Sequence, residues 1–240
     1  MIRYRHPLVP ARFLHRENRF RVTVEVEGDR VAAHLPNSGR LEELLTPDRP
    51  VWLEPAGRAG RKTAYDLRLV CFAGVLVSVD ARLPNSLLAE ALTASHLTPF
   101  TEYPLVTREV RRGESRLDFH LNGATDAPPC WIETKSVTLV DRVQTGLALF
   151  PDAPTVRGRR HLKELAAAVA DGERAAVVFV VQRSDATRFA PNASADAAFA
   201  TALAEAARVG VELYAYTCQV TLEGVALDGS IPVDLDGGRR

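Results

Sequence analysis

Cysteine is scarce in this chain, which has only Cys71, Cys130 and Cys218 in 240 residues. The three are far apart and form no Cys-x-x-Cys pair. This spacing argues against a structural zinc site, whose ligands come in closely spaced pairs. So few cysteines are also typical of proteins in a reducing compartment, and we expect a cytoplasmic location.

Long apolar runs are absent as well. No segment approaches the roughly 18 to 20 apolar residues that a membrane-spanning helix needs. The N-terminal sequence MIRYRHPLVPARF has basic residues but no apolar signal core, so we expect neither a secretion signal nor a membrane partner. With 46% hydrophobic and 25% charged residues, the composition is that of an ordinary globular chain with one large domain or two smaller ones.

Net charge is the third absence. The formal charge is zero, so no global basic field indicates a nucleic-acid partner. The charge is unevenly distributed, however: residues 1–62 contain 12 basic and 8 acidic residues, whereas residues 185–240 contain 4 basic and 8 acidic ones. Six arginines, including Arg19, lie within the first 21 residues with only Glu17 against them. This cluster fits phosphate binding and equally fits a solvated arginine-rich surface.

The first 80 residues are rich in short strand patterns. Alternation of apolar and polar residues and turn signals predict five strands and one helical turn near Leu41–Leu45. Five strands and a short helix predict a small OB-like barrel, a fold that often binds nucleic acid, and we place this domain at residues 1–81. The predicted strands are Arg19–Glu27, Arg30–Leu35, Val51–Glu54, Tyr65–Phe72 and Val75–Val79.

Two local features of this half have an open interpretation. The loop Gly57–Lys62 (GRAGRK), with Arg61 and Lys62, fits contact with a nucleic-acid backbone and also fits a flexible hairpin tip. The sequence Leu-Pro-Asn-Ser occurs at residues 35–38 and again at residues 83–86. Because Pro-Asn-Ser suits a helix start, capping alone would account for this recurrence.

The pattern changes after Asp80. The predicted order is α-β-β-β-α-β-α-β, which describes an α/β domain with a mixed sheet, here at residues 82–240. The run AAVVFVV at residues 175–181 is typical of a strand buried on both faces. Thr155 is placed to cap a helix that ends at Ala170, before Gly172. The other predicted elements are helices Ser86–His96 and Ala195–Arg208 and strands Leu105–Arg112, Arg116–Leu121, Cys130–Leu139 and Val211–Val220.

Asp118, Glu133 and Lys135 are the candidate catalytic residues. Asp118 lies on the second predicted strand of this domain, and Glu133 and Lys135 share a face of the third. Two carboxylates, with the backbone carbonyl between Glu133 and Lys135, suit Mg²⁺ or Mn²⁺, and Asp118 and Glu133 are the expected metal ligands. The D…ExK pattern on this αβββαβ element order is typical of the PD-(D/E)xK nuclease superfamily. Ordinary surface ion pairs on adjacent strands would also give this pattern.

Nearly the whole chain resembles the sugar fermentation stimulation protein A family. The resemblance implies an N-terminal OB-like domain, a C-terminal domain of restriction-endonuclease-like fold, DNA binding and a link to the regulation of sugar (maltose) metabolism genes. Thr134 departs from the family, which often has Val there, but it points away from the site. The resemblance rests on HLPNSGRLEELL (34–45), VDARLPNSLLAEAL (79–92), SRLDF (115–119), IETKSVTLV (132–140), ALFPDAPTVRGRRHLKEL (148–165) and VVFVVQR (177–183).

The resemblance also implies roles for further residues. Arg157 and Arg160 crowd the start of one helix and are expected to contact the DNA backbone, together with Arg40 in the first motif; the alternative is a solvated helix face. Glu90 stands where many nucleases of this fold carry an extra acidic residue, and it is otherwise a plain surface residue. His161 fits a general acid or base and also fits a structural hydrogen bond, and we expect the structural hydrogen bond.

Two functional hypotheses follow. The first is a Mg²⁺-dependent phosphodiesterase that acts on DNA and holds its backbone without sequence specificity. The second is a non-catalytic DNA-binding protein that regulates sugar metabolism genes and retains a nuclease fold. A sugar-binding or sugar-modifying protein is disfavoured because no sugar-enzyme motif is present. The sequence does not fix the oligomeric state.

Overall fold

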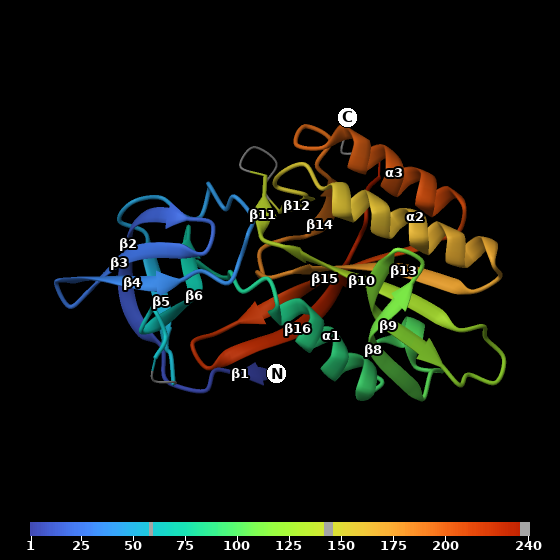
Figure 1. Ribbon diagram of the computed structural model, residues 1–240, viewed down its shortest axis with the longest axis horizontal. Helices are drawn as coiled ribbons and strands as arrows, with labels where there is room; N and C mark the ends of the chain where they lie inside the picture. The colour runs from blue at the N-terminus through green and yellow to red at the C-terminus, as the bar shows by residue number, and fades with distance from the viewer. Residues whose placement is uncertain (58–59, 142–145, 236–240) are drawn as a thin grey trace.

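A β-barrel and a larger α/β domain lie side by side along the long axis of the molecule (Figure 1). The computed structural model describes residues 1–57, 60–141 and 146–235. Within these residues, no helix is long and apolar enough to cross a membrane. Arg58 and Ala59 of the predicted loop Gly57–Lys62 lie outside the described residues.

Five strands close the N-terminal barrel, which confirms the predicted OB-like fold. The strand order is β4-β3-β2-β5-β6, and a parallel pairing of β4 with β6 closes the ring, with β7 added on the other side of β6. Apolar side chains such as Val22, Leu53 and Leu67 fill the interior. The strands are β2 (Val9–Asn18), β3 (Arg21–Val26), β4 (Asp29–His34), β5 (Pro50–Pro55), β6 (Tyr65–Phe72) and β7 (Val75–Ser78).

Strand β2 is the barrel strand that the sequence pattern did not predict. Its pairing with β3 shifts register between Phe13 and His15 and again between Arg16 and Asn18. Each shift interrupts the alternation of inward and outward side chains, and only Phe13 is fully buried along the strand. The arginine cluster therefore lies partly on a barrel strand. The predicted helical turn is confirmed, because the N–H groups of Leu44 and Leu45 donate to the Leu41 carbonyl.

A seven-stranded mixed sheet forms the second domain. Its order is β1-β16-β15-β13-β10-β9-β8, with β10, β13 and β15 mutually parallel and the remaining pairs antiparallel. The central strand β13 is buried on both faces, as its apolar run predicts. The strands are β1 (Ile2–Arg3), β8 (Leu105–Arg112), β9 (Ser115–Asn122), β10 (Cys130–Val137), β13 (Arg174–Val181), β15 (Glu212–Val220) and β16 (Gly224–Ile231).

Helices cover both faces of this sheet. Figure 1 shows α2 (Val156–Ala170) and α3 (Ala197–Arg208) on one face and α1 (Leu83–Thr93) on the other. Two separate apolar clusters fill the two spaces between helices and sheet, one around Leu162 and one around Leu88. A 3-10 turn, η1 (Thr98–Phe100), follows α1. The predicted cap of α2 is confirmed, because the Thr155 hydroxyl accepts a 3.0 Å hydrogen bond from the Gly158 N–H.

Several elements differ from the predicted order. A small second sheet of β11 (Leu139–Val140), β12 (Leu147–Phe150) and β14 (Arg188–Pro191) occupies segments without a strand pattern, and β1 and β16 extend the main sheet. Because β1 pairs with β16, residues 2–3 join the second domain's sheet. Helix α1 begins three residues before the predicted Ser86, because Pro84 fits the first helical turn, where its missing N–H costs no hydrogen bond.

Buried polar contacts join the two domains. Gln182 at the end of β13 accepts a 3.0 Å hydrogen bond from the Ser78 hydroxyl of the barrel and donates a 2.9 Å bond to the Ser136 hydroxyl of β10. Gln182 is fully buried, so these bonds form away from water, where an unmade bond costs most. The barrel is thereby fixed against the strand that carries the candidate site.

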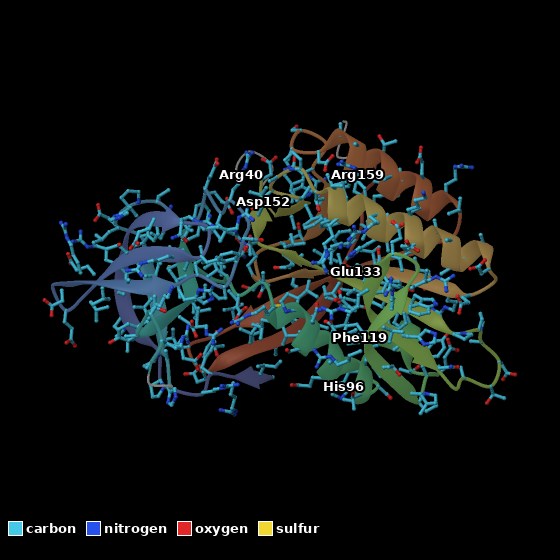
Figure 2. The ribbon with its side chains drawn as sticks, viewed as in Figure 1. Arg40, His96, Phe119, Glu133, Asp152 and Arg159 are labelled. Carbon is cyan, nitrogen blue, oxygen red and sulfur yellow. The ribbon has the colours of Figure 1, made fainter. Side chains whose placement is uncertain are left out.

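Asp152 makes a second connection across the junction. Its Oδ2 accepts a 2.6 Å hydrogen bond from the backbone N–H of Arg40 and a 3.4 Å bond from that of Leu41 (Figure 2). A side chain on Gly39 would place Cβ only 2.6 Å from the same oxygen, so this close approach requires glycine. Arg16 holds the loop from the barrel side by donating to the carbonyls of Gly39 and Arg40, each at 2.7 Å.

Replacing Asp152 with alanine is expected to weaken this junction. Loss of hydrogen bonds to a charged acceptor should lower the free energy of unfolding by about 1–2 kcal/mol, measured by urea denaturation. Asp126→Ala, in an exposed turn, is the matched control and should change little. Equal denaturation midpoints for the Asp152 variant and the wild type would contradict the role of this contact.

Candidate active site

Strands β9 and β10 separate at the position of Asp118. Their antiparallel register runs from Cys130 paired with Leu121 to Ile132 paired with Phe119. At the next position, Asp118 Oδ2 instead accepts a 2.8 Å hydrogen bond from the backbone N–H of Thr134. The N–H and C=O of one strand residue point toward the same neighbouring strand. The Thr134 carbonyl therefore faces Asp118, as its N–H does.

Glu133 and Lys135 project from β10 toward α2 and are almost completely buried. Their exposed fractions are 3% and 8%, respectively. They share a strand face with Trp131, which packs in the same apolar cluster as Leu162 of α2. Lys135 Nζ donates a 2.7 Å hydrogen bond to Glu133 Oε1. Glu133 Oε2 is buried without a hydrogen-bond partner among the described residues.

His161 of α2 contacts the same carboxylate and confirms the predicted hydrogen-bonding role. Its Nδ1 contacts Glu133 Oε1, and its Nε2 accepts a 3.2 Å hydrogen bond from Arg157 Nε. Since an arginine can only donate, the imidazole carries its proton on Nδ1 and donates it to Glu133. Lys135 Nζ lies 3.5 Å from Nδ1, which is then a contact between two donors.

The two carboxylates have opposite pKa shifts. Burial and, secondarily, the charge of Glu133 raise the pKa of Asp118 to about 6. Burial alone would raise the pKa of Glu133 as well, but the Lys135 ammonium and the His161 hydrogen bond outweigh it and hold that pKa below its ordinary value. At neutral pH both groups are ionised and repel each other across the space between β9 and β10.

These residues fit a hard divalent cation. The donors are the Asp118 carboxylate, the Glu133 carboxylate with its unpaired Oε2, and the Thr134 carbonyl, and all are oxygen ligands. The described part of the chain has no group of three or more His, Cys, Asp and Glu side chains suited to a metal ion. Mg²⁺ needs few protein ligands because it keeps several waters, so the donor set favours it over zinc.

A cavity of about 310 Å³ opens beside Lys135 at the junction of the two domains. The barrel loop that follows β4 forms one wall, and β10 with the segment before α2 forms the other. Lys135 therefore lines a space that both domains enclose, although its side chain is largely buried, whereas Asp118 and Glu133 do not line this space. The lining includes Asn37, Ser38, Lys135, Ser136, Phe150 and Asp152.

Asn85 is a site residue that sequence reasoning missed. Its Nδ2 donates a 2.6 Å hydrogen bond to Asp118 Oδ1, so both oxygens of Asp118 accept hydrogen bonds. Asn85 lies in the second Leu-Pro-Asn-Ser copy, which the sequence analysis explained by capping. In the structure this segment is already the first turn of α1, and the amide is free to point at the strand. The repeated Leu-Pro-Asn-Ser motif was the one feature of the sequence that singled out Asn85.

Glu90 is not brought to the site. It lies five residues after Asn85 on α1, so it projects from a different side of the helix, and its half-exposed carboxylate pairs with the N-terminal ammonium. Arg157 does reach the site through its bond to His161. Arg160 is exposed one position before His161.

The other predicted DNA-binding residues form two groups, Arg19 with Arg40 and Arg61 with Lys62. Arg40 is exposed at the junction beside Asp152 (Figure 2), and Arg19 is exposed on the adjacent barrel turn that Arg16 holds. Arg61 forms a two-bond ion pair with Asp66, at 3.0 and 2.5 Å, and lines a different cavity. Lys62 is exposed next to it.

Three of the N-terminal arginines are engaged within the barrel. Arg12 pairs with Glu25 and Asp48, and Arg21 pairs with Glu17. Arg16 donates to backbone carbonyls of the loop beside Asp152. Contacts within the protein therefore occupy three of the six arginines in the cluster, and no phosphate ligand is needed to explain the presence of these three.

Comparison with known proteins gives one consistent result. The model for the sugar fermentation stimulation protein RE domain matches residues 82–224, and the model for the SfsA N-terminal OB domain matches residues 14–79. A sugar fermentation stimulation protein homolog from Moorella thermoacetica is 52% identical and covers 95% of this chain and 97% of its own length. The homolog from Desulforamulus reducens is 46% identical, with 95% and 93% covered.

A solved structure agrees over the full length. The structure of Pyrococcus furiosus SfsA in complex with Ca²⁺ matches with a TM-score of 0.86 and 32% sequence identity, covering 98% of this chain and 100% of that one. This match confirms the predicted combination of an OB-like barrel and a mixed-sheet α/β domain.

The raised pKa of Asp118 predicts a specific pH dependence of stability. Between about pH 4 and the folded pKa of about 6, the folded protein retains a proton that the unfolded chain has released. The free energy of unfolding should therefore fall as pH rises through this window, by up to about 3 kcal/mol. Urea denaturation in EDTA of wild type and Asp118→Asn should show this fall only in the wild type. Parallel curves for the two proteins would contradict it.

The hydrogen bond from Asn85 predicts a second titration effect. This bond favours the charged form of Asp118, so Asn85→Leu should raise the Asp118 pKa further above about 6. The measurement is the NMR titration of the Asp118 carboxyl carbon in EDTA. Asn122→Leu, an exposed change on the same strand, is the control and should leave the value unchanged. An unchanged or lower pKa in Asn85→Leu would show that Asn85 does not hold the carboxylate.

Proposed function

This chain belongs to the sugar fermentation stimulation protein family, and on that premise we propose that it binds DNA and carries a Mg²⁺-dependent phosphodiesterase site. The observation that carries the proposal is the unpartnered, buried Oε2 of Glu133, which lies on β10 next to the backbone that holds Asp118. A buried carboxylate oxygen without a partner is costly unless a cation completes its shell. Ca²⁺ in the Pyrococcus furiosus relative supports a hard cation here.

Each residue of the site has a distinct role in this proposal. Asp118 and Glu133 would hold Mg²⁺, which when bound supplies Lewis-acid polarisation of the phosphodiester and activation of water. The Lys135 ammonium would orient the attacking water and offset negative charge that develops on the phosphorus oxygens. His161 would fix the orientation of Glu133, and Asn85 would fix that of Asp118. A phosphodiester would approach Lys135 from the junction cavity that this residue lines.

Backbone contacts would hold the DNA near this site. Arg157 stands in the first turn of α2, where the helix N-terminus and a guanidinium both favour a phosphate. Three further arginines have exposed side chains and would extend the contact with the DNA backbone: Arg160, Arg40 and Arg19. Arg61 is a weaker candidate because Asp66 already neutralises it. Contacts of this type bind DNA of any sequence.

The alternative is a DNA-binding protein of the same fold that does not cleave. One observation favours it: Glu133 Oε1 already accepts hydrogen bonds from both Lys135 and His161, so the carboxylate is partly satisfied without a metal. In this case the ion pair would serve only to hold β10 and α2 together, and regulation of sugar metabolism genes would depend on binding alone.

Cleavage separates the two proposals. Purified wild type with Mg²⁺ or Mn²⁺ should cut at least one of supercoiled, linear duplex, single-stranded or branched DNA, and EDTA should abolish the cut. Lys135→Ala and Asp118→Ala should each lower the rate by about 10²-fold or more, because each removes stabilisation of the transition state. Arg208→Ala, on exposed α3 surface, is the control. Binding without cleavage on every substrate would support the alternative.

Salt dependence tests the proposed backbone contacts. DNA affinity should fall steeply between about 50 and 200 mM salt, because each phosphate contact releases counterions. The double variant Arg157→Ala/Arg160→Ala should bind more weakly and with a shallower slope, by about one unit or more in log Kd against log salt. An affinity that does not change with salt, or a slope equal to that of the wild type, would remove these arginines from the interface.

A further inference from the structure

A second cavity, of about 730 Å³, lies apart from the candidate active site. The N-terminal segment, the ends of β5 and β6 and the first turn of α1 enclose it. The linker between the domains separates the two cavities: Ala81 lines the first, whereas Asp80 and Arg82 line the second. Asp118, Glu133 and Lys135 do not line this second cavity.

The carboxylates of this cavity are buried and already paired. Arg68 bridges Glu54, at 2.7 Å, and Asp80. Asp80 also accepts a 2.8 Å contact from Arg82, and Asp66 pairs with Arg61 as described above. These acids are therefore neutralised locally and leave no unbalanced negative charge to attract a cation.

The cavity lining has more positive than negative side chains. Arg3 and Arg5 also line the cavity, and within the described residues no carboxylate forms an ion pair with either side chain. Five arginines face three carboxylates, so the lining has a net charge of +2 with histidines neutral. A polar enclosure with surplus guanidinium charge favours an anionic ligand.

Tyr4 provides an independent observation. It lines the same cavity, and its phenolic oxygen is buried without a hydrogen-bond partner among the described residues. Burial raises the Tyr4 pKa, so the hydroxyl stays protonated at neutral pH and is available to donate to an acceptor that the described residues do not supply. An unmade hydrogen bond of a buried group is costly, and an anion's oxygen would remove that cost.

We propose that this cavity binds a phosphomonoester of about nucleotide size, with its phosphate held by the Tyr4 hydroxyl and the guanidinium groups of Arg3 and Arg5. A phosphomonoester carries a charge of about −1.5 to −2 at neutral pH, which matches the surplus of the lining. The cavity is far larger than phosphate alone, and Ser86, which also lines it, offers a hydrogen bond for a hydroxyl group of an attached sugar. This proposal does not depend on cleavage at the first site.

Calorimetric titration of the full chain in EDTA tests the proposal. The probes are inorganic phosphate, adenosine 5′-monophosphate and glucose 6-phosphate, each ester beside its unphosphorylated form. At least one ester should bind one to one with Kd of roughly 1 mM or tighter, and its unphosphorylated form should bind at least about tenfold more weakly. A higher affinity for one ester identifies a nucleotide or a sugar phosphate as the ligand source. Equal affinity for phosphate and both esters would overturn recognition of the organic part.

Variants locate the bound ligand. Tyr4→Phe should weaken binding about tenfold and Arg3→Ala/Arg5→Ala by more, whereas Arg208→Ala and Asp118→Asn should leave it unchanged. Tyr4→Phe removes only a hydroxyl without a partner, so its ligand-free melting temperature should equal or exceed that of the wild type. The proposal fails if no probe binds, if binding is lost in Asp118→Asn instead, or if Tyr4→Phe melts at a lower temperature without ligand.

Discussion

The buried ion pair between Glu133 and Lys135 is the constraint on which the rest of the second domain depends. Removing a carboxylate and an ammonium from water is costly, and their mutual attraction offsets that cost only when geometry and further hydrogen bonds are good. Here the pair lies on β10, held between β13 and β9, and α2 brings His161 to the same oxygen. The arrangement still leaves Glu133 Oε2 without a partner. The cost of this unsatisfied oxygen is the basis of the metal site that we propose.

At the junction between the domains, the barrel contributes residues to the surroundings of the candidate site. The loop after β4 reaches Asp152, and Gln182 links a barrel strand to β10, so the position of Lys135 depends on contacts from both domains. The short linker that follows β7 has a cavity on each side. A ligand in one cavity and a substrate in the other would therefore contact neighbouring residues of this linker, Ala81 on one side and Asp80 and Arg82 on the other.

Prediction from sequence succeeds where one periodicity dominates. The apolar run of β13, the Thr155 cap of α2 and the alternation that puts Glu133 and Lys135 on one face are local patterns, and the structure contains all three. Strand β2 was missed because two register shifts break its alternation, and β14 because four residues in a turn-rich segment carry little pattern.

Site residues far apart in sequence were harder to predict. Asn85 reaches Asp118 only because α1 starts three residues early, and the rotation of that helix about its axis also points Glu90 elsewhere. Which side of a helix faces the sheet depends on tertiary packing, and a single sequence does not reveal this packing. The pairing of Asp66 with Arg61, which weakens a predicted DNA contact, is equally hidden from spacing.

The most direct test of the metal site is the anomalous diffraction of crystals grown with Mn²⁺, which takes the same oxygen ligands as Mg²⁺ and scatters anomalously. If Asp118 and Glu133 hold the metal, one strong peak should lie within about 2.0–2.3 Å of a carboxylate oxygen of each, and it should be lost in Asp118→Ala crystals. A peak elsewhere, or none at these carboxylates at saturating Mn²⁺, would rule out this metal site.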